Sequence, residues 1–281
     1  MTTLITSIAD MRAARAELSG TVALVPTMGA LHDGHLSLIR LARQHAEHII
    51  VSVFVNPLQF GPNEDFDRYP RDLHADLAAV EGLADLVFAP TTEEMYPLPD
   101  PFRVDVGPIG SVLEGAARPG HFSGVATVVL KLLTIISPDL AVFGQKDAQQ
   151  LTVVRRLVAD FNLPVAIIPA PIIREETGLA RSSRNAYLSE QGRRDALALS
   201  HLLRDLQHHA MPAADLRIFL SALADTEAVQ WDYAEALDAE TFQPISSDFI
   251  GEALVVCAAR VDGVRLLDNA FVNVSTPAGE R

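Results

Sequence analysis

Short apolar runs alternate with longer amphipathic segments from residue 22 to residue 168, and this alternation restricts the chain to a narrow class of folds. The run at 49–55 is continuous and rich in β-branched residues, as in a strand covered on both faces in a parallel sheet. A series of β-α-β units with right-handed crossovers predicts an α/β fold, a Rossmann-like doubly wound parallel sheet. The expected strands are 22–25, 49–55, 85–89, 140–143 and 165–168, and the expected helices are 34–42, 72–83, 125–136 and 151–161.

The C-terminal part of the chain has a different pattern. Asp262-Gly263 separates two apolar runs, and an Asp-Gly pair in this position is a strong signal for a β-hairpin. Two amphipathic helices precede it, so this part is predicted to be α+β rather than more parallel sheet. The segments are a loop at 174–185, helices around 191–209 and 213–224, and strands at 254–256 and 264–267.

A length of 281 residues exceeds the usual size of a single hydrophobic core. The change of pattern near Pro171 therefore marks an expected domain boundary. We expect a Rossmann-like domain over residues 1–172 and a smaller C-terminal α+β domain over residues 173–281.

The charge balance argues against nucleic acid as a partner. Asp and Glu number 36 against 22 Lys and Arg, a formal charge of −14, which repels a phosphate backbone. Any site for a phosphorylated ligand must then be a local region of positive potential. The single cysteine, Cys257, lies in an apolar run and is expected to be a core residue. Because it is the one cysteine in the sequence, a disulfide cannot form within the chain.

Neither a secretory signal nor a membrane span is expected. The N-terminus lacks a basic region followed by an apolar one, and Lys131 interrupts the longest apolar stretch. We therefore expect a cytoplasmic location and no membrane partner.

The loop after the first predicted strand contains two histidines and two glycines at the start of a helix. It reads Pro-Thr-Met-Gly-Ala-Leu-His-Asp-Gly-His over residues 26–35. Glycine lets the backbone approach phosphate closely, and a helix N-terminus offers free N–H groups and partial positive charge. Because imidazoles can donate to phosphate oxygens, this loop predicts a site for the triphosphate of ATP.

Other interpretations of His32 and His35 remain open. The histidines could cap the helix or lie on the surface, and their spacing of three would suit zinc, although no neighbouring motif supplies further ligands. The loop is neither a Walker loop nor a dinucleotide fingerprint. Residues 32–35 do resemble the His-x-Gly-His signature of the class I aminoacyl-tRNA synthetase and nucleotidylyltransferase superfamily.

The loops after two later strands and one segment at the domain boundary are also rich in polar side chains. Asn56 and Gln59 place amides among apolar residues, a combination suited to a small polar-apolar substrate, although Asn56 is equally explained as a turn residue before proline. Lys146 is a point charge aimed where phosphate would lie, and its neighbour Asp147 either orients ATP and its magnesium or caps a helix. Residues 181–185 read as a flexible lid with cations and hydroxyls.

Taken together, these motifs resemble the pantoate–beta-alanine ligase (pantothenate synthetase) family of that superfamily, and their order and spacing match over almost the whole chain. The resemblance implies that pantoate attacks the α-phosphorus of ATP, releasing pyrophosphate, and that β-alanine then attacks pantoyl-adenylate, releasing AMP. It also implies Mg²⁺ with the ATP and a homodimer. The motifs are residues 26–35, 54–60, 118–122, 143–147 and 182–185, with the weaker match Leu266-Leu267-Asp268-Asn269 in the C-terminal domain.

The resemblance also implies roles for particular residues. His35 is the implied proton donor, His32 a phosphate contact and Lys146 a third catalytic residue, while the C-terminal domain closes as a lid. Asp76 is only a weak candidate for a magnesium ligand, so the metal ligands stay unknown. The implied ATP-binding residues are Met28, Gly29, Ala30, Leu31, His32, Asp33, Gly34, His35, Gly144, Gln145, Lys146, Asp147, Ile173, Arg181, Ser182, Ser183 and Arg184; those for pantoate are Gln59 and Gln150, with Gln59 also near β-alanine and Asn56 beside them.

Three positions depart from the family's pattern. Gln145 stands where Glu is usual, Ala148 where an aromatic residue is usual, and Arg181 where the residue is usually apolar. Arg181 adds positive charge to the predicted lid and is expected to tighten nucleotide binding. Two rival functions fit the histidines: a nucleotidylyltransferase acting on a phosphorylated small molecule, and a nucleotide-sensing module, which would leave Gln59, Lys146 and Gln150 unexplained.

Overall fold

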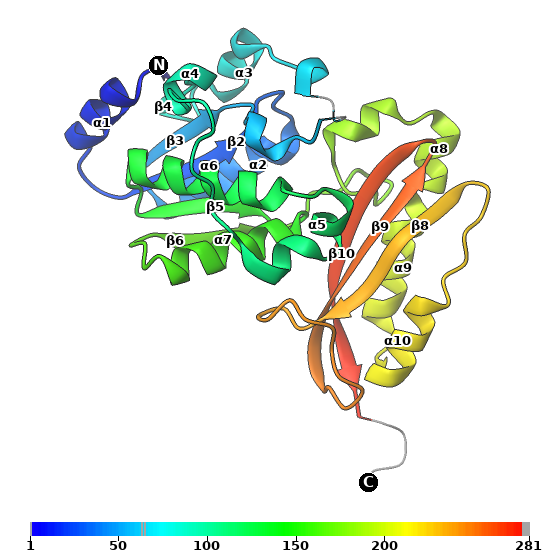
Figure 1. Cartoon of the computed structure of the whole chain (residues 1–281). Coiled ribbons are helices and arrows are strands. Elements are labelled where there is room, and N and C mark those ends of the chain that lie inside the picture. The colour runs from blue at the N-terminus through cyan, green and yellow to red at the C-terminus, as the bar shows by residue number, and fades with distance from the viewer. Residues whose placement is uncertain (1, 63, 65, 277–281) are drawn as a thin grey trace. The chain divides into compact units, whose positions relative to one another are not determined.

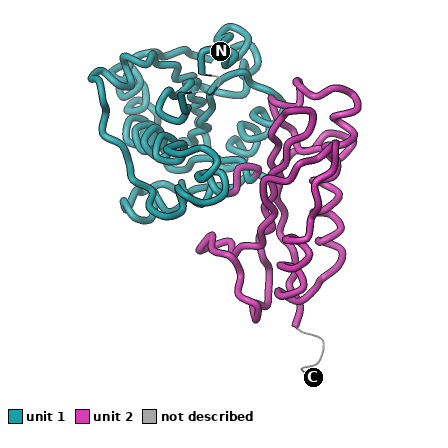
Figure 2. Tube along the Cα trace, turned by 45° about the vertical axis from the view of Figure 1, so that its right-hand side comes forward, with its two compact units in different colours: residues 1–145, 149–171 teal, residues 146–148, 172–281 magenta. Residues whose placement is uncertain are grey.

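A computed structural model describes residues 2–62, 64 and 66–276 of the chain. The chain divides into two compact units, coloured differently in Figure 2: residues 1–145 with 149–171, and residues 146–148 with 172–281. Each unit has a sheet and an apolar core of its own. The second unit includes the segment 146–148, which lies within the range 1–172 expected for the first domain.

The first unit is built on a six-stranded parallel sheet in the order β1-β4-β3-β2-β5-β6 (Figure 1). This order confirms the predicted doubly wound sheet, because the chain runs outward from β2 in one direction and then returns to add β5 on its other side. The point where the order reverses lies between β2 and β5, and ligands of such sheets bind beyond the carboxyl ends of the strands at this point. The strands are β1 (Thr3–Ile5), β2 (Val22–Thr27), β3 (His48–Val53), β4 (Leu86–Phe88), β5 (Leu140–Gly144) and β6 (Ala166–Ala170).

Helices cover both faces of this sheet (Figure 1). On one face, Ile39 and Ala42 of α2 and Val80 of α3 pack in one apolar cluster with alternate residues of the strands, such as Val25 and Val51. Helix α6 is buried along most of its length and packs against α1, β2 and η1. The helices are α1 (Ile8–Glu17), α2 (Asp33–His45), α3 (Leu73–Val80), α4 (Thr92–Met95), α5 (Glu114–Ala117), α6 (His121–Ile136) and α7 (Ala148–Asp160), with 3-10 turns η1 (Pro57–Gln59), η2 (Phe66–Arg68) and η3 (Gly107–Ser111).

The second unit is a four-stranded sheet in the order β7-β10-β9-β8. Helices α9 and α10 contact this sheet and close an apolar core with alternate residues of β9 and β10. This arrangement confirms the predicted smaller α+β fold, although the helix expected over 191–209 is two helices that meet at Ala196. The elements are η4 (Ser183–Tyr187), α8 (Glu190–Asp195), α9 (Leu197–His208), β7 (Met211–Pro212), α10 (Ala213–Ser221), β8 (Val229–Leu237), β9 (Gly251–Val261) and β10 (Val264–Ser275).

The predicted hairpin joins β9 to β10 through Asp262 and Gly263. Both residues have positive φ, 53° and 75°, as a two-residue turn with the twist of a hairpin requires. The Asp262 carboxylate also accepts a hydrogen bond from the backbone N–H of Ser189 at 2.8 Å, so the turn is tied to the start of α8.

Cys257 is a buried core residue, as expected: its thiol donates to the carbonyl oxygen of Asp268, and burial raises the thiol's pKa far above its ordinary value. Within the described ranges, no helix combines the length and the apolar character that crossing a bilayer requires.

Candidate active site

The histidine loop leaves the carboxyl end of β2 beside the point where the strand order reverses. Gly29 and Ala30 turn the backbone with φ of 83° and 51°. A β-carbon at Gly29 would lie 2.7 Å from Oδ2 of Asp76, so glycine is required there both for its conformation and for its lack of a side chain.

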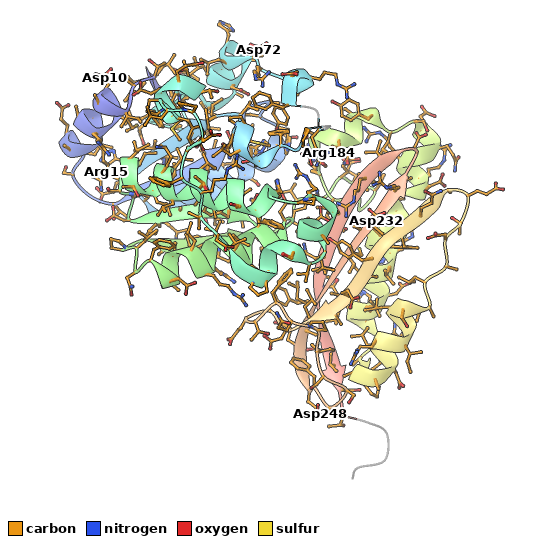
Figure 3. The ribbon with its side chains drawn as sticks, viewed as in Figure 1. Asp10, Arg15, Asp72, Arg184, Asp232 and Asp248 are labelled. Atoms are coloured by element: carbon orange, nitrogen blue, oxygen red, sulfur yellow. The ribbon has the colours of Figure 1, made fainter. Side chains whose placement is uncertain are left out.

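Asp76 of α3 holds this loop in place. Its two carboxylate oxygens accept hydrogen bonds from the backbone N–H groups of Ala30, at 3.2 Å, and Leu31, at 2.8 Å, and the residue is only 4% exposed. Asp72, labelled in Figure 3, caps the same helix by accepting from the N–H of Ala75 at 2.9 Å. Because the loop occupies both oxygens of Asp76, this geometry gives it a positioning function.

His32 and His35 cap the N-terminus of α2 with their rings. Nδ1 of His32 accepts from the N–H of Gly34 at 3.1 Å, and Nδ1 of His35 accepts from the N–H of His32 at 3.3 Å. The ring centroids are 4.1 Å apart. An imidazole that accepts through Nδ1 carries its proton on Nε2, so both rings have the same tautomer, with the N–H at Nε2. The capping interpretation and the phosphate-binding interpretation are therefore compatible.

Asn56 is the buried centre of a hydrogen-bond network at the end of β3. Its Nδ2 donates to Oε1 of Gln59 and to the carbonyl oxygen of Gly124, each at 3.0 Å. Its Oδ1 accepts from the N–H of Leu58 at 3.3 Å and from the hydroxyl of Tyr96 at 2.9 Å. Both donors and both acceptor positions of the carboxamide are thus used within the protein.

Tyr96 remains a donor to Asn56 over a wide pH range. Burial of its hydroxyl raises the pKa of Tyr96 well above its ordinary value, an effect only partly opposed by the charge of Arg103. The phenol therefore stays protonated, and it fixes which way the Asn56 amide faces.

Gln59 links the amide loop to the histidine loop. Its Nε2 donates to the sulfur of Met28 at 3.1 Å, while Asn56 holds its Oε1. Thioether sulfur is a weak acceptor, so a carboxylate or hydroxyl oxygen of a substrate would replace it readily. Asn56 therefore fixes the orientation of the Gln59 side chain, and the Met28 sulfur is the partner that a substrate oxygen would replace.

The backbone of Gln59 is fixed by residues of the Arg-Pro-Gly-His-Phe motif. Its carbonyl oxygen accepts from Nδ1 of His121 at 2.8 Å and from Nη2 of Arg118 at 3.2 Å. Since a carbonyl can only accept, His121 carries its proton on Nδ1, and its Nε2 accepts from Nη1 of Arg118 at 3.1 Å. Arg118 also pairs with Glu64, whose pKa is lowered, chiefly by the Arg118 hydrogen bond.

Residues after β5 form the other side of the reversal point. The N–H of Gln145 bonds to the carbonyl of Ala170 at 2.9 Å, which continues the sheet ladder past Gly144. Gln149 is buried and donates to the carbonyl oxygens of Ile109 and Val112, at 2.8 and 2.9 Å. Gln150 follows it in the first turn of α7 and is half-buried.

A cavity of about 260 Å³ opens at the carboxyl ends of β3 and β4. It is lined by Met28, Asp76 and the start of α3, but not by His32, His35, Gln59 or Gln150. The predicted contacts to substrate therefore do not share this cavity, apart from Met28.

The remaining predicted nucleotide residues belong to the second unit. The N–H of Arg181 bonds to the carbonyl of Ile173 at 2.9 Å, which makes these two residues neighbours in a small loop. Ser182 caps η4 by accepting from the N–H of Arg184, labelled in Figure 3, at 3.3 Å. Lys146 and Ser182 line one small cavity within this unit.

The predicted site residues thus form two sets, one in each unit. In the first unit, hydrogen bonds connect Met28 to Gln59 and Gln59 to Asn56, while Gly144 ends strand β5 and Gln145 and Gln150 follow it in the chain. In the second unit, Ile173 is joined to Arg181, and Lys146 shares a cavity with Ser182.

A family profile described as pantoate-beta-alanine ligase matches residues 3–271 of the chain. The chain belongs to this family. The resemblance inferred from the motifs is thereby confirmed. The conformations of the histidine loop and the amide loop are accordingly those of a pantoate-beta-alanine ligase family member.

Curated relatives and solved structures agree with this assignment. A pantothenate synthetase of Acidothermus cellulolyticus is 55% identical over 272 residues, covering 94% of this chain and 89% of the relative. A crystal structure of the enzyme from Thermus thermophilus has a TM-score of 0.87 at 45% identity and covers 96% of this chain and 99% of its own. A pantoate-beta-alanine ligase from Francisella tularensis, complexed with beta-gamma ATP and beta-alanine, has a TM-score of 0.77 at 34% identity, with 96% and 97% covered.

Several supporting residues have no clear signal in the sequence. Tyr96 lies 40 residues beyond its partner Asn56, and a lone tyrosine does not indicate such a contact. The sequence suggests Asp76 only as a weak magnesium ligand, whereas the structure shows it bound to the loop amides. Arg118 and His121 belong to a family motif, which does not by itself indicate that they hold the backbone of Gln59.

Proposed function

We propose that this chain catalyses the ATP-dependent condensation of pantoate with β-alanine to give pantothenate. A carboxylate oxygen of pantoate attacks the α-phosphorus of ATP and pyrophosphate leaves, forming pantoyl-adenylate. The amine of β-alanine then attacks the acyl carbon and AMP leaves. Membership of the family and the identity of about half to relatives named pantothenate synthetase support the overall reaction.

One structural observation carries the proposal: the hydrogen bond from Nε2 of Gln59 to the sulfur of Met28. It connects an amide suited to a hydroxy acid with the loop suited to a triphosphate. An acid held by Gln59 would therefore lie next to phosphate held by the histidine loop. Alignment of two bound substrates supplies a large part of the rate enhancement that such a reaction needs, without an enzyme nucleophile.

The histidines act on the phosphates in this proposal. Both carry their N–H at Nε2 and lie at the N-terminus of α2, where the helix dipole also favours negative charge. Donors placed before the reaction stabilise the charge that develops on the phosphoryl oxygens and on pyrophosphate. His35 would also donate the proton, and His32 would hold a phosphate oxygen, while the backbone of residues 28–34 surrounds the nucleotide.

Gln59 and Gln150 bind pantoate in this proposal, and Gln59 also contacts β-alanine. Asn56 contributes mainly by holding Oε1 of Gln59, since its own carboxamide has four partners in the protein. Gly144 and Gln145 contact the nucleotide through their backbone.

The second unit supplies further nucleotide contacts and serves as a lid. Lys146 neutralises phosphate charge, and it is the third catalytic residue we propose. Arg181 adds a cation that most family members are expected to lack, so we expect Arg181→Met to weaken ATP binding. Unchanged ATP affinity in that variant would contradict this role. The other proposed contacts are Asp147, Ile173, Ser182, Ser183 and Arg184.

Magnesium enters with the nucleotide rather than through a protein cage. Within the described residues, no group of three or more His, Cys, Asp or Glu side chains could hold a metal ion, and Asp76 uses both oxygens on backbone amides. Mg²⁺ commonly binds through substrate phosphates and water with few protein ligands. When bound it would neutralise phosphate charge, and the residues present fit this arrangement better than a dedicated metal site.

We also propose that the protein works as a homodimer in the cytoplasm, on the basis of the family resemblance. Light scattering coupled to size-exclusion chromatography tests the dimer, and a mass of one chain at micromolar concentration would exclude it.

The decisive experiment is isotope exchange between pyrophosphate and ATP. We expect exchange when pantoate is present and β-alanine is absent, followed by pantothenate and AMP once β-alanine is added. Exchange that does not depend on pantoate, ADP as a product, or a stable dinucleotide-like product would refute the ligase assignment.

A further inference from the structure

Strand β10 contains two adjacent polar residues that are almost fully buried. Asp268 is 4% exposed and Asn269 is 5% exposed. Neighbouring residues of a strand point to opposite faces of its sheet. Burial of such groups is unfavourable unless each is hydrogen-bonded, so this pair needs specific partners on both faces.

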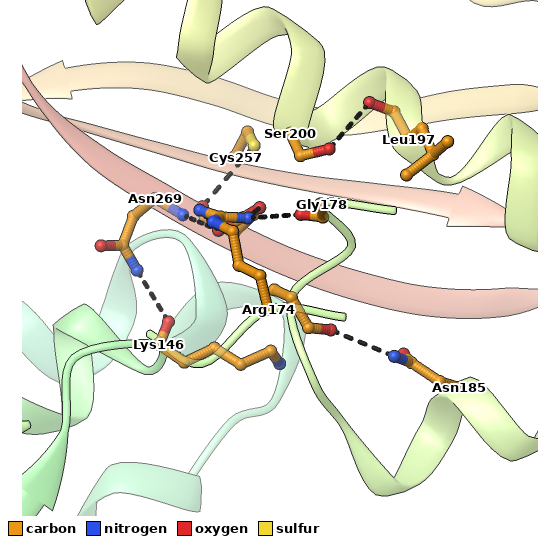
Figure 4. Close-up of polar contacts among 10 residues, drawn as sticks. Lys146, Arg174, Gly178, Asn185, Leu197, Ser200, Cys257 and Asn269 are labelled. Atoms are coloured by element: carbon orange, nitrogen blue, oxygen red, sulfur yellow. Dashed lines mark hydrogen bonds and ion pairs between the residues drawn. The ribbon is translucent and has the colours of Figure 1, made fainter. Parts of the chain in front are cut away.

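Asp268 lies on the face that α9 and α10 cover, beside core residues such as Leu266 and Val272. Its carboxylate pairs with Arg174 in a two-pronged arrangement, with Nη1 to Oδ2 at 2.6 Å and Nη2 to Oδ1 at 3.0 Å. Arg174 also donates to the carbonyl of Gly178 at 3.1 Å. The ion pair thus anchors the start of residues 173–185 to the middle of β10 (Figure 4).

Asn269 lies on the opposite face and holds the backbone of Lys146. Its Nδ2 donates to the carbonyl oxygen of Lys146 at 2.8 Å (Figure 4). The backbone N–H of Asn269 donates to Oδ1 of Asp268 at 2.8 Å, so the Asp268 carboxylate is bonded to the same residue that holds Lys146. Asn269 is 123 residues from Lys146 in the chain.

The segment anchored by Arg174 is cross-linked by hydrogen bonds up to the serine motif. Arg174 and Ala180 form a backbone bridge, and the side chain of Asn185 donates to Glu175 at 2.9 Å and to the carbonyl of Ala180 at 3.1 Å. Lys146, Ser182 and Asp268 line the same small cavity. Lys146 and Ser182 are both proposed to bind nucleotide. Adjacent residues of β10 therefore hold both regions: Asn269 bonds to Lys146, and Asp268 bonds to Arg174 at the start of the segment that leads to Ser182.

We infer that Asn269 is a positioning residue for Lys146, and that Asp268 positions residues 173–185 through Arg174, so that β10 sets where the second unit presents its phosphate-binding groups. This inference rests on the proposed function in one respect, namely that Lys146 contacts the nucleotide. It gives the Leu-Leu-Asp-Asn motif a function: the hairpin serves as the support of the catalytic lysine.

Asn269→Ala is the direct test because it removes the donor to the carbonyl oxygen of Lys146. We expect kcat/KM for ATP in pantoate-dependent exchange to fall about ten- to a hundredfold, the scale of a displacement near 1 Å at a reacting group. Asn269→Asp, which has the same shape but faces the carbonyl with an acceptor, should lose at least as much. Asn273→Ala is the matched control, since Asn273 lies on the same strand and face but is exposed, and it should retain full activity.

A double-mutant cycle separates positioning from general stability. If Asn269 acts through Lys146, Asn269→Ala should change activity less than about threefold in a Lys146→Ala background, because coupled residues are not additive. The inference would be overturned if Asn269→Ala lowered activity equally in both backgrounds. It would also be overturned if a lowered melting temperature accounted for the whole loss of activity.

The same double-mutant cycle can be carried out on ATP affinity, measured by calorimetry, and this measurement does not depend on the reaction. If the wild-type protein shows no pantoate-dependent exchange, the proposed function fails, yet the calorimetric cycle still decides the positioning role. In that case Asn269→Ala should weaken ATP binding only when Lys146 is present.

Discussion

A methyl group added at Gly124 should damage the substrate site through the backbone of Gln59. The position of that methyl is fixed by α6, and it would meet the carbonyl group of Leu58 and the amide nitrogen of Gln59. The nitrogen, at 2.6 Å, would have to retreat by about 0.8 Å to reach an ordinary van der Waals contact, which begins at 3.4 Å. All three atoms belong to the main chain, so no side-chain rotation can relieve the clash.

The consequence for catalysis follows from the neighbouring contacts. Gly124 also accepts from Nδ2 of Asn56, the group that orients Gln59, so the displacement reaches both the backbone and the amide of Gln59. A shift near 1 Å at a positioning residue can cost about a hundredfold in rate. Overpacking of this kind also costs about 1–3 kcal/mol of folding free energy.

Steady-state kinetics with each substrate varied in turn, together with thermal unfolding, measures both effects. For Gly124→Ala we expect kcat/KM for pantoate to fall about ten- to a hundredfold, with a smaller effect on KM for ATP because α2 and its capping histidines are not displaced. Thr134→Ala, at an exposed position on the same helix, should behave as wild type. A Gly124→Ala enzyme within threefold of wild type for pantoate would refute the account of how Gln59 is held.

Three further changes test other parts of the site. His35→Ala should lower turnover about 10²–10³-fold, the scale for one transition-state donor; a loss below about threefold in exchange assays would reduce the histidine to a helix cap. Asp76→Asn should cost about 1–3 kcal/mol, because an NH₂ group would then face a loop amide, and it should weaken ATP binding in calorimetry; an unchanged melting temperature and affinity would contradict the role of Asp76 in holding the loop. The hydrogen bond from Arg118 holds the pKa of Glu64 below its ordinary value of 4.5, so the pair's stabilisation is complete above that pH and is lost as the pH falls through the lower folded-state pKa. Glu64→Gln should flatten this acid dependence of unfolding, and a parallel pH profile for variant and wild type would disprove it.

The fold could be predicted wherever the local pattern was strong. The buried strands of the first sheet appear as β-branched runs, and the Asp262-Gly263 turn has the residues that its positive φ values demand. Three strands were missed: β7, which has only two residues, and two others for identifiable reasons. β1 has only three residues, and β8 is an edge strand whose polar residues resemble a loop, so both depend on pairing with distant strands.

The candidate site likewise contains residues that the local sequence indicates and supporting residues that only contacts between distant parts of the chain reveal. Gln59, the histidines and Lys146 follow strand ends and have side chains that ordinary turns do not require, so the sequence indicates them. Their supports are ordinary residues far away in the chain: Tyr96 lies 40 residues from Asn56, and Asp76 lies 45 residues from Leu31. No single-sequence pattern predicts such pairs, because each partner is explained equally well by its own local surroundings.

Burial offers a physical criterion for these supports once the fold is known. A polar side chain less than a tenth exposed must satisfy its donors and acceptors inside the protein, so its partners identify what it holds. Asn56, Asp76 and Asn269 all meet this condition, and each binds a segment that carries a proposed substrate contact. Gln59 is itself 8% exposed, but its Nε2 donates to a weak sulfur acceptor, a partner that a bound substrate would replace. Strong hydrogen bonds to main-chain groups or to Gln59 therefore mark Asn56, Asp76 and Asn269 as residues that position the site, and their variants should change its geometry without removing a reacting group.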